Sequence, residues 1–226
     1  MSANAVRRLQ SENDLAAAVA ALSQQCRIMR AIEKRVGVPP LRDFPANFSG
    51  LAKIVTGQQL SAQSAAAIWA RAAAAIQPFE AAGLLAVPDG ELAALGLSGG
   101  KIRTLRAAAC AVVDGQLNFR ALNRKSDAAV HETLTSLHGI GPWTADIYLL
   151  FALRRADAFA PGDLALQLAA ARLFKLESRP TPQELTLLAE RWRPWRGAAA
   201  RLLWADYGHS RAAAKTRQPV SATKKA

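Results

Sequence analysis

Apolar residues recur at helical spacing along most of the chain, and no segment shows a sustained alternation of apolar and polar residues. The hydrophobic fraction of the 226 residues is 51% and draws heavily on alanine, whereas aromatic residues make up only 6%. Alanine has the highest helix propensity, so this composition favours packed helices over a β-sandwich. The sequence therefore predicts an all-α fold of nine or ten helices.

Three breaks interrupt the helical pattern without dividing the chain into separate domains. Residues 38–50, VPPLRDFPANFSG, are predicted to form an irregular connection because they are rich in Pro and Gly. A second break falls at Gly57–Ser61, and residues 157–163, DAFAPGD, form a short loop. We expect one globular unit over residues 1–210, followed by a basic and disordered tail over residues 211–226.

The formal net charge of +12 indicates an anionic partner, and nucleic acid is the leading candidate. Five of these positive charges lie in the last sixteen residues, so a charge of +7 remains for the rest of the chain. A solvated basic surface without a specific role is the alternative.

Membrane insertion, secretion and transition-metal binding find little support in the sequence. The chain has no apolar run of membrane-spanning length, and MSANAVRRLQSENDL lacks the apolar stretch of a secretory signal, so we expect a cytoplasmic protein. Its two cysteines, Cys26 and Cys110, lie far apart in apolar helical patterns and are predicted to be buried small hydrophobes.

The segment from Leu134 to Asp146, LTSLHGIGPWTAD, predicts two helices joined by a tight turn in which Gly139 and Gly141 bracket Ile140. Such a turn presents backbone amides at the positive end of the following helix, where they can bind a DNA phosphate. An ordinary helix C-cap that happens to contain G-x-G is the alternative.

An aspartate, Asp163, follows this turn by twenty-two residues and opens another helix after Pro161 and Gly162. A helix N-cap is the commonest use of an aspartate at such a position, and that reading stays open beside a catalytic one.

Together these segments resemble the helix-hairpin-helix (HhH-GPD) DNA glycosylase superfamily, and more closely its 3-methyladenine DNA glycosylase II branch. The resemblance rests on five blocks that span most of residues 50–205: IVTGQQLSAQSAA (54–66), GLSGGKIRTLRAAA (96–109), GIGPWTAD (139–146), FAPGDLALQ (159–167) and WRPWRGAAARLLW (192–204). It implies a two-lobed helical fold, with a central lobe at about 50–150, a second lobe from the N- and C-terminal helices, and an active-site cleft between the lobes.

The resemblance makes Asp163 the catalytic carboxylate, which would stabilise the oxocarbenium character of the sugar as the N-glycosidic bond breaks. Trp143 stands where the lyase-competent branch has a lysine nucleophile, so hydrolysis without strand cleavage is expected. Trp143 and Trp204 would line the base pocket, although both could be ordinary packing residues. Ile147 and Leu164 occupy positions where some relatives have tyrosines, so the pocket is expected to be less aromatic.

The resemblance also implies DNA contacts from the hairpin and from the break at residues 57–61. In the hairpin the residues are Gly139, Ile140, Gly141 and Thr144; in the break they are Gln58, Gln59, Leu60 and Ser61, with Gln59 or Leu60 as the wedge that fills the space of the flipped nucleotide. A polar helix break without DNA contact is the alternative. Lys101 and Arg103 are candidate phosphate contacts, or else solvated surface charges.

No cofactor is expected beyond a structural Na⁺ or K⁺, which relatives hold in the hairpin turn through backbone carbonyls that match Thr135, Leu137 and Gly139. His138 lies in this turn but receives no catalytic role, because it has no second ligand nearby.

The resemblance implies a monofunctional glycosylase that removes alkylated purines, such as 3-methyladenine and 7-methylguanine, from damaged double-stranded DNA, with the protein acting as a monomer. Two alternatives stay open: the same fold acting on a deaminated or oxidised base, and a DNA-binding module without excision activity.

Overall fold

The computed structural model describes residues 7–42 and 44–217, and the chain folds into two compact units. Unit 1 comprises residues 1–9 and 42–158, and unit 2 comprises residues 10–41 and 159–226. The all-α prediction is confirmed within the described residues, where the only extended pairing is one antiparallel bridge between Arg8 and Arg155. None of the described helices is both long and apolar enough to cross a membrane.

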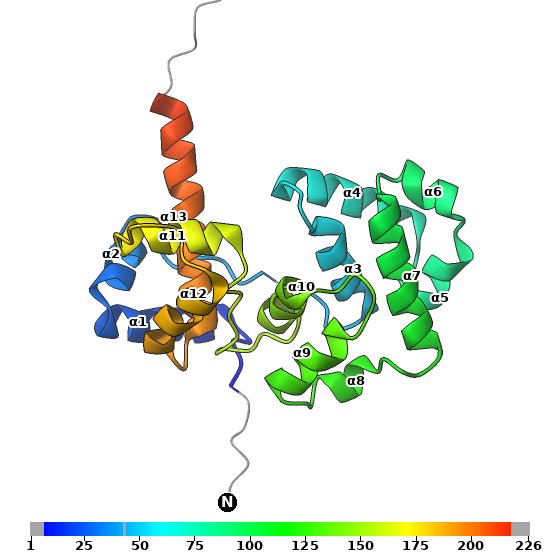
Figure 1. The fold of residues 1–226 in the computed structure, drawn as a ribbon, viewed down its shortest axis with the longest axis horizontal. Helices are drawn as coiled ribbons and strands as arrows, with labels where there is room; N and C mark the ends of the chain where they lie inside the picture. The colour runs from blue at the N-terminus through cyan, green and yellow to red at the C-terminus, as the bar shows by residue number, and fades with distance from the viewer. Residues whose placement is uncertain (1–6, 43, 218–226) are drawn as a thin grey trace, which may run out of the picture. The chain divides into compact units, whose positions relative to one another are not determined.

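Unit 1 consists of short helices, and Figure 1 shows them in cyan and green. They are α3 (Phe48–Gly57), α4 (Ala62–Ala75), α5 (Ala81–Ala86), α6 (Asp89–Ala94), α7 (Gly99–Val113), α8 (Phe119–Leu122), α9 (Asp127–Thr135), α10 (Pro142–Ile147) and the π-helix η1 (Tyr148–Ala152). The helix α7 is the centre of this unit, because it packs against α3, α5 and α6. Its buried residues Ile102, Leu105, Ala108 and Ala109 lie at helical spacing and explain that packing.

Unit 2 combines helices from the N-terminal part of the chain with helices from its C-terminal part. Its elements are α1 (Glu12–Gln25), α2 (Arg27–Val36), α11 (Leu164–Leu173), α12 (Pro182–Ala189), the 3₁₀ turn η2 (Glu190–Trp192) and α13 (Arg196–Arg217). The helix α13 contacts α1, α2, α11 and η2, so segments far apart in sequence share one core. Trp192 is fully buried there, with the rings of Phe159 and Phe174 each 5.8 Å from its own centroid.

The prediction of nine or ten helices is wrong, because the described chain forms thirteen α-helices. The difference arises chiefly from α5 and α8, which contain six and four residues and so are too short for a clear apolar period. The irregular connection is also shorter than predicted, since α3 begins at Phe48, where the Asn47 side chain accepts a hydrogen bond from the Gly50 amide.

Two further predictions need correction. The tail was predicted to be disordered from Arg211, but α13 continues to Arg217, which agrees with the helix propensity of its alanines; residues 218–226 lie outside the described part. Cys110 is exposed on α7, and Cys26 is half-buried at the junction where α1 ends and α2 begins, so neither cysteine belongs to the core.

Unit 2 holds a fully buried carboxylate, that of Asp206 on α13. Arg35 of α2 donates to its Oδ1 through Nε, at 2.7 Å, and Arg172 of α11 forms an ion pair with its Oδ2. Because Asp206 is inaccessible to water, these two guanidinium groups replace its hydration and tie three helices together.

We expect Asp206→Ala to lower the free energy of unfolding by about 2 kcal/mol, less than for a wholly buried pair because both arginines are partly exposed. Urea denaturation followed by circular dichroism measures this loss. The matched control is Asp89→Ala, which removes an exposed carboxylate paired with Arg106 and should cost at most about 1 kcal/mol. Equal losses in the two variants would contradict a supporting role for the buried carboxylate.

Candidate functional site

The predicted hairpin is present in unit 1 between α9 and α10. Gly139 adopts a φ of +75° and is exposed, whereas Ile140 is 3% exposed and points into the core. The Ile140 amide donates to the Leu137 carbonyl at 3.2 Å, which closes the turn. Gly141 is then the N-cap of α10, and Pro142 occupies its first position, where the missing amide hydrogen costs nothing.

The backbone at Gly139 lies against the buried side chain of Thr104 on α7. A Cβ atom added to Gly139 would fall 2.9 Å from the Thr104 Cβ and closer still to its hydroxyl oxygen. Glycine is therefore required at this position for two reasons: the positive φ and the close approach to Thr104. Around Gly141 a Cβ atom would meet nothing within 4 Å.

The segment of residues 57–61 comprises the last residue of α3 and the loop that leads to α4, and Gln58 ties it to the hairpin. Its side-chain amide donates to the Thr144 hydroxyl at 2.8 Å and more weakly to the Gly139 carbonyl at 3.4 Å. Sequence analysis predicted both segments as DNA contacts, and the structure brings these three residues together.

The other residues of the 57–61 loop have different environments. Gln59 is exposed with a φ of +55°, a left-handed conformation that is uncommon outside glycine. Leu60 is 39% exposed, which is high for a large apolar side chain. Ser61 is the N-cap of α4, and its hydroxyl accepts from the Ser64 amide at 3.1 Å, so this residue has a structural role beside any DNA contact.

Lys101 and Arg103 differ, although both lie in the first turn and a half of α7. The Lys101 ammonium donates to the Thr56 carbonyl at 2.7 Å, and partial burial lowers the pKa of this lysine below its usual value. Arg103 is exposed. Only Arg103 therefore presents its charge mainly to solvent.

The predicted pocket residues of unit 1 lie on α10. Trp143 is half-buried, and Ile147 is 6% exposed and belongs to the core. The helix then widens into the π-helix η1, which the sequence did not predict. Its first residue, Tyr148, is fully buried; burial raises the pKa of its phenol, and its hydroxyl has no hydrogen-bond partner.

Asp163 in unit 2 is half-buried and is the N-cap of α11. Its Oδ1 accepts a hydrogen bond from the Leu166 amide at 3.0 Å and a second from the indole Nε1 of Trp204, on α13, at 2.9 Å. The N-cap reading of Asp163 is thus correct, and it is compatible with a catalytic role. Leu164, the next residue, is 52% exposed.

The hydrogen bond between Trp204 and Asp163 does not follow from the sequence, although both residues are predicted site residues. They lie 41 positions apart on different helices, and no periodic pattern connects them. Trp204 was predicted to stack on a base, whereas the structure shows its indole N–H donating to the carboxylate. The Trp204 ring is half-buried, so a stacking role stays a prediction.

The predicted cation ligands are the carbonyl groups of Thr135, Leu137 and Gly139. The Leu137 carbonyl accepts from Ile140, and the Gly139 carbonyl accepts weakly from Gln58. A carbonyl oxygen has two lone pairs, and uncharged carbonyl oxygens suit alkali cations, so this donor set fits such an ion. Within the described residues no three His, Cys, Asp or Glu side chains gather as a candidate metal site.

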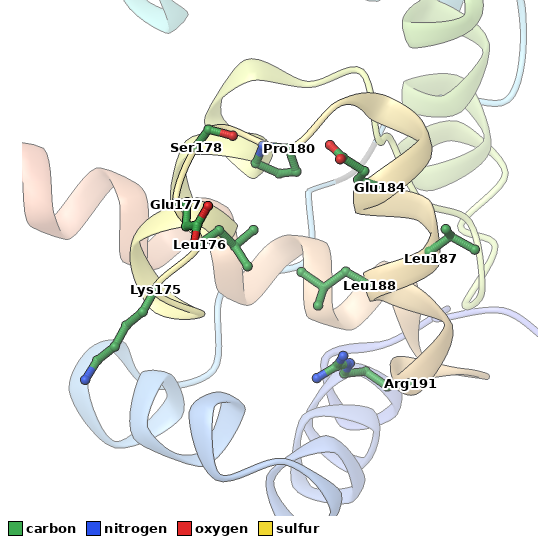
Figure 2. Close-up of a pocket in the computed structure, with 9 residues that line it drawn as sticks. All are labelled: Lys175, Leu176, Glu177, Ser178, Pro180, Glu184, Leu187, Leu188 and Arg191. Atoms are coloured by element: carbon green, nitrogen blue, oxygen red, sulfur yellow. The ribbon is translucent and has the colours of Figure 1, made fainter.

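A cavity of about 600 Å³ also lies in unit 2 (Figure 2). Leu176 and Leu188 point into it, with Lys175 and Arg191 at its edge. Its lining begins at Lys175, just after the C-terminal end of α11, whereas Asp163 caps the N-terminal end of that helix. This cavity is therefore separate from the predicted catalytic carboxylate.

The chain is similar to one family model and to several known proteins. Residues 52–194 match the family model described as HhH-GPD superfamily base excision DNA repair protein. DNA-3-methyladenine glycosylase 1 of Schizosaccharomyces pombe is 34% identical over 120 residues, which cover 50% of this chain and 53% of that protein. DNA-3-methyladenine glycosylase 2 of Escherichia coli is 30% identical over 125 residues, which cover 55% of this chain and 41% of that protein. The chain matches 32% of the length of a Bacillus subtilis relative.

Two solved structures are similar over most of their length. The S. pombe 3-methyladenine DNA glycosylase in complex with abasic DNA has a TM-score of 0.75 at 28% identity, covering 83% of this chain and 95% of that one. The DNA-3-methyladenine glycosidase of Bacillus halodurans has a TM-score of 0.70 at 28% identity, covering 91% of this chain and 94% of that one.

The hairpin geometry predicts different responses at its two glycines. Gly139→Ala should lower the free energy of unfolding by about 3 kcal/mol, because it combines strain at positive φ with the overlap at Thr104. Gly141→Ala should cost at most about 1 kcal/mol, since its φ is −91° and the space around it is open. Chemical denaturation of both variants measures the difference, and similar losses would show that the close approach to Thr104 is not needed.

Proposed function

Because the chain belongs to the HhH-GPD superfamily of base excision DNA repair proteins, we propose that it hydrolyses the N-glycosidic bond of alkylated purines in double-stranded DNA and leaves an abasic site. The observation that carries this proposal is the carboxylate of Asp163, held by an amide and an indole N–H at the start of α11. The similarity of the chain to 3-methyladenine glycosylases supports alkylated bases as the substrate class.

The chemistry assigned to Asp163 is electrostatic. As the bond to the base breaks, positive charge develops on the deoxyribose, and a fixed carboxylate lowers the energy of that transition state. The two donors on Oδ1 restrict rotation of the carboxylate, so it needs little reorganisation when the charge appears. The same carboxylate can also orient the water that attacks the sugar. A cationic alkylated base is already a good leaving group, so no strong general acid is required.

In this proposal the hairpin of unit 1 holds the DNA strand. The amides around Gly139 and Gly141 bind a phosphate, and Gln59 or Leu60 fills the space left by the extruded nucleotide. Exposure of the Gln59 and Leu60 side chains supports a wedge role for either residue. An alkali cation bound by the carbonyls of Thr135, Leu137 and Gly139 would add positive charge beside that phosphate.

The absence of an amine at Trp143 supports hydrolysis over a lyase reaction. A lysine at this position could form a Schiff base with the sugar, whereas an indole cannot. The aromatic ring is suited instead to stacking on an extruded, positively charged base.

Replacement of Asp163 tests the catalytic assignment. We expect wild-type protein to release 3-methyladenine and 7-methylguanine from alkylated duplex DNA, and Asp163→Asn to reduce single-turnover release by about 100-fold or more. Asparagine keeps the N-cap acceptor, so the variant should fold and still bind duplex that contains an abasic site. The control is Asp114→Asn, an exposed acid at the end of α7, which should retain full activity. Normal turnover by Asp163→Asn would exclude this mechanism, and a parallel panel of deaminated and oxidised lesions identifies a different substrate class.

The monofunctional assignment predicts no covalent complex with DNA. Incubation with abasic or lesion-containing duplex and sodium borohydride should leave protein and DNA unlinked on a denaturing gel, because Trp143 offers no amine for Schiff base formation. Efficient trapping would identify a lyase, and a Trp143→Lys variant tests whether that position can supply the missing amine.

A further inference from the structure

Two side-chain contacts hold the start of the 57–61 segment, one just before it and one at its second residue. On its N-terminal side, Lys101 donates to the carbonyl of Thr56, the penultimate residue of α3. Within the loop, Gln58 donates to Thr144 and Gly139 of the hairpin. Directly after these two anchors, Gln59 and Leu60 are exposed.

The environment of Lys101 differs from that of a lysine whose ammonium is available to bind a phosphate. Its ammonium satisfies a carbonyl of the last turn of α3, where the helix dipole is negative and backbone acceptors lack helical partners. Thr56 is buried and Lys101 is half-buried, so the contact is partly shielded from bulk water. Binding a phosphate with this ammonium would weaken a charge-assisted bond that the fold already contains.

The conformation of Gln59 explains why such an anchor is needed. A left-handed φ in a residue other than glycine is costly and persists only where the surrounding structure enforces it. Lys101 fixes the chain three residues before Gln59, and Gln58 fixes it immediately before Gln59. Both anchors rest on α7 and the hairpin, because Thr104, one turn after Lys101, packs against Gly139.

We propose that Lys101 is a positioning residue whose ammonium holds the end of α3, so that Gln59 and Leu60 are presented to the duplex in a fixed relation to the hairpin. Lys101 then governs how readily the target nucleotide is extruded, rather than how strongly the phosphate backbone is bound. This inference rests on the proposed function, since it assigns a role in base extrusion.

Lys101→Met tests the proposal because it keeps the aliphatic stem and removes the ammonium. We expect single-turnover release from a fully paired lesion to fall by about tenfold or more, the size expected for loss of one charge-assisted hydrogen bond. Release from a lesion opposite an abasic site, which needs little unpairing, should change much less. Lys101→Arg should restore much of the paired-lesion rate, because a guanidinium group can also donate to the Thr56 carbonyl.

The salt dependence of duplex binding separates positioning from phosphate contact. Lys101→Met should leave the slope of log affinity against log salt unchanged, whereas Arg103→Met should reduce it by about 0.9 if that exposed arginine contacts one phosphate. Arg120→Met, an exposed cation on α8, is the matched charge control and should change neither the slope nor the release rates. Thermal melts of every variant verify folding.

Three outcomes would overturn the proposal. A reduced salt slope in Lys101→Met would make the residue a phosphate contact. An equal loss of release from paired and unpaired lesions would indicate general damage to the site. If 2-aminopurine placed next to the target nucleotide gave the same fluorescence with Lys101→Met as with wild-type protein, extrusion would not depend on Lys101. That fluorescence reports extrusion even if no base is released, so it distinguishes failure of this proposal from failure of the proposed function.

Discussion

The close approach of the Gly139 backbone to Thr104 constrains the arrangement of unit 1. It places the hairpin turn directly on α7, the helix around which this unit is packed. Lys101, one turn earlier on α7, holds the end of α3, and Gln58 links the following loop back to the hairpin. The hairpin turn and the 57–61 segment are thereby supported by one helix, an arrangement that the proposed function would use to hold a DNA strand while distorting it.

In unit 2, hydrogen bonds rather than a close backbone contact hold the side chain of Asp163. Asp163 is immobilised through Oδ1 by one backbone and one side-chain donor, and the side-chain donor comes from α13. The position of α13 relative to α11 is in turn held by the buried Asp206, which lies two residues after Trp204 and pairs with Arg172 of α11. The fully buried Asp206 thus stabilises the same pair of helices that orients the half-buried Asp163.

Local signals accounted for most of what the sequence predicted correctly. The all-α class, the break at Gly57–Ser61, the hairpin and the helix that starts after Asp163 all follow from spacing, glycine and capping residues that lie close together in the chain. The contacts between Lys101 and Thr56, and between Trp204 and Asp163, join residues 45 and 41 positions apart. Such pairs depend on how helices pack, and no local pattern in a single sequence encodes that packing.

The double use of Asp163 as cap and carboxylate constrains how this position can evolve. Replacement by alanine or leucine would remove the acceptor for the Leu166 amide and cost about 1 kcal/mol in folding, whatever happened to the chemistry. Asparagine or serine would retain the cap. Under the proposed function, a descendant that abandoned excision while still needing its fold would therefore drift first to these residues, so either one at this position in a homologue would mark relaxed selection on the reaction and continued selection on the scaffold.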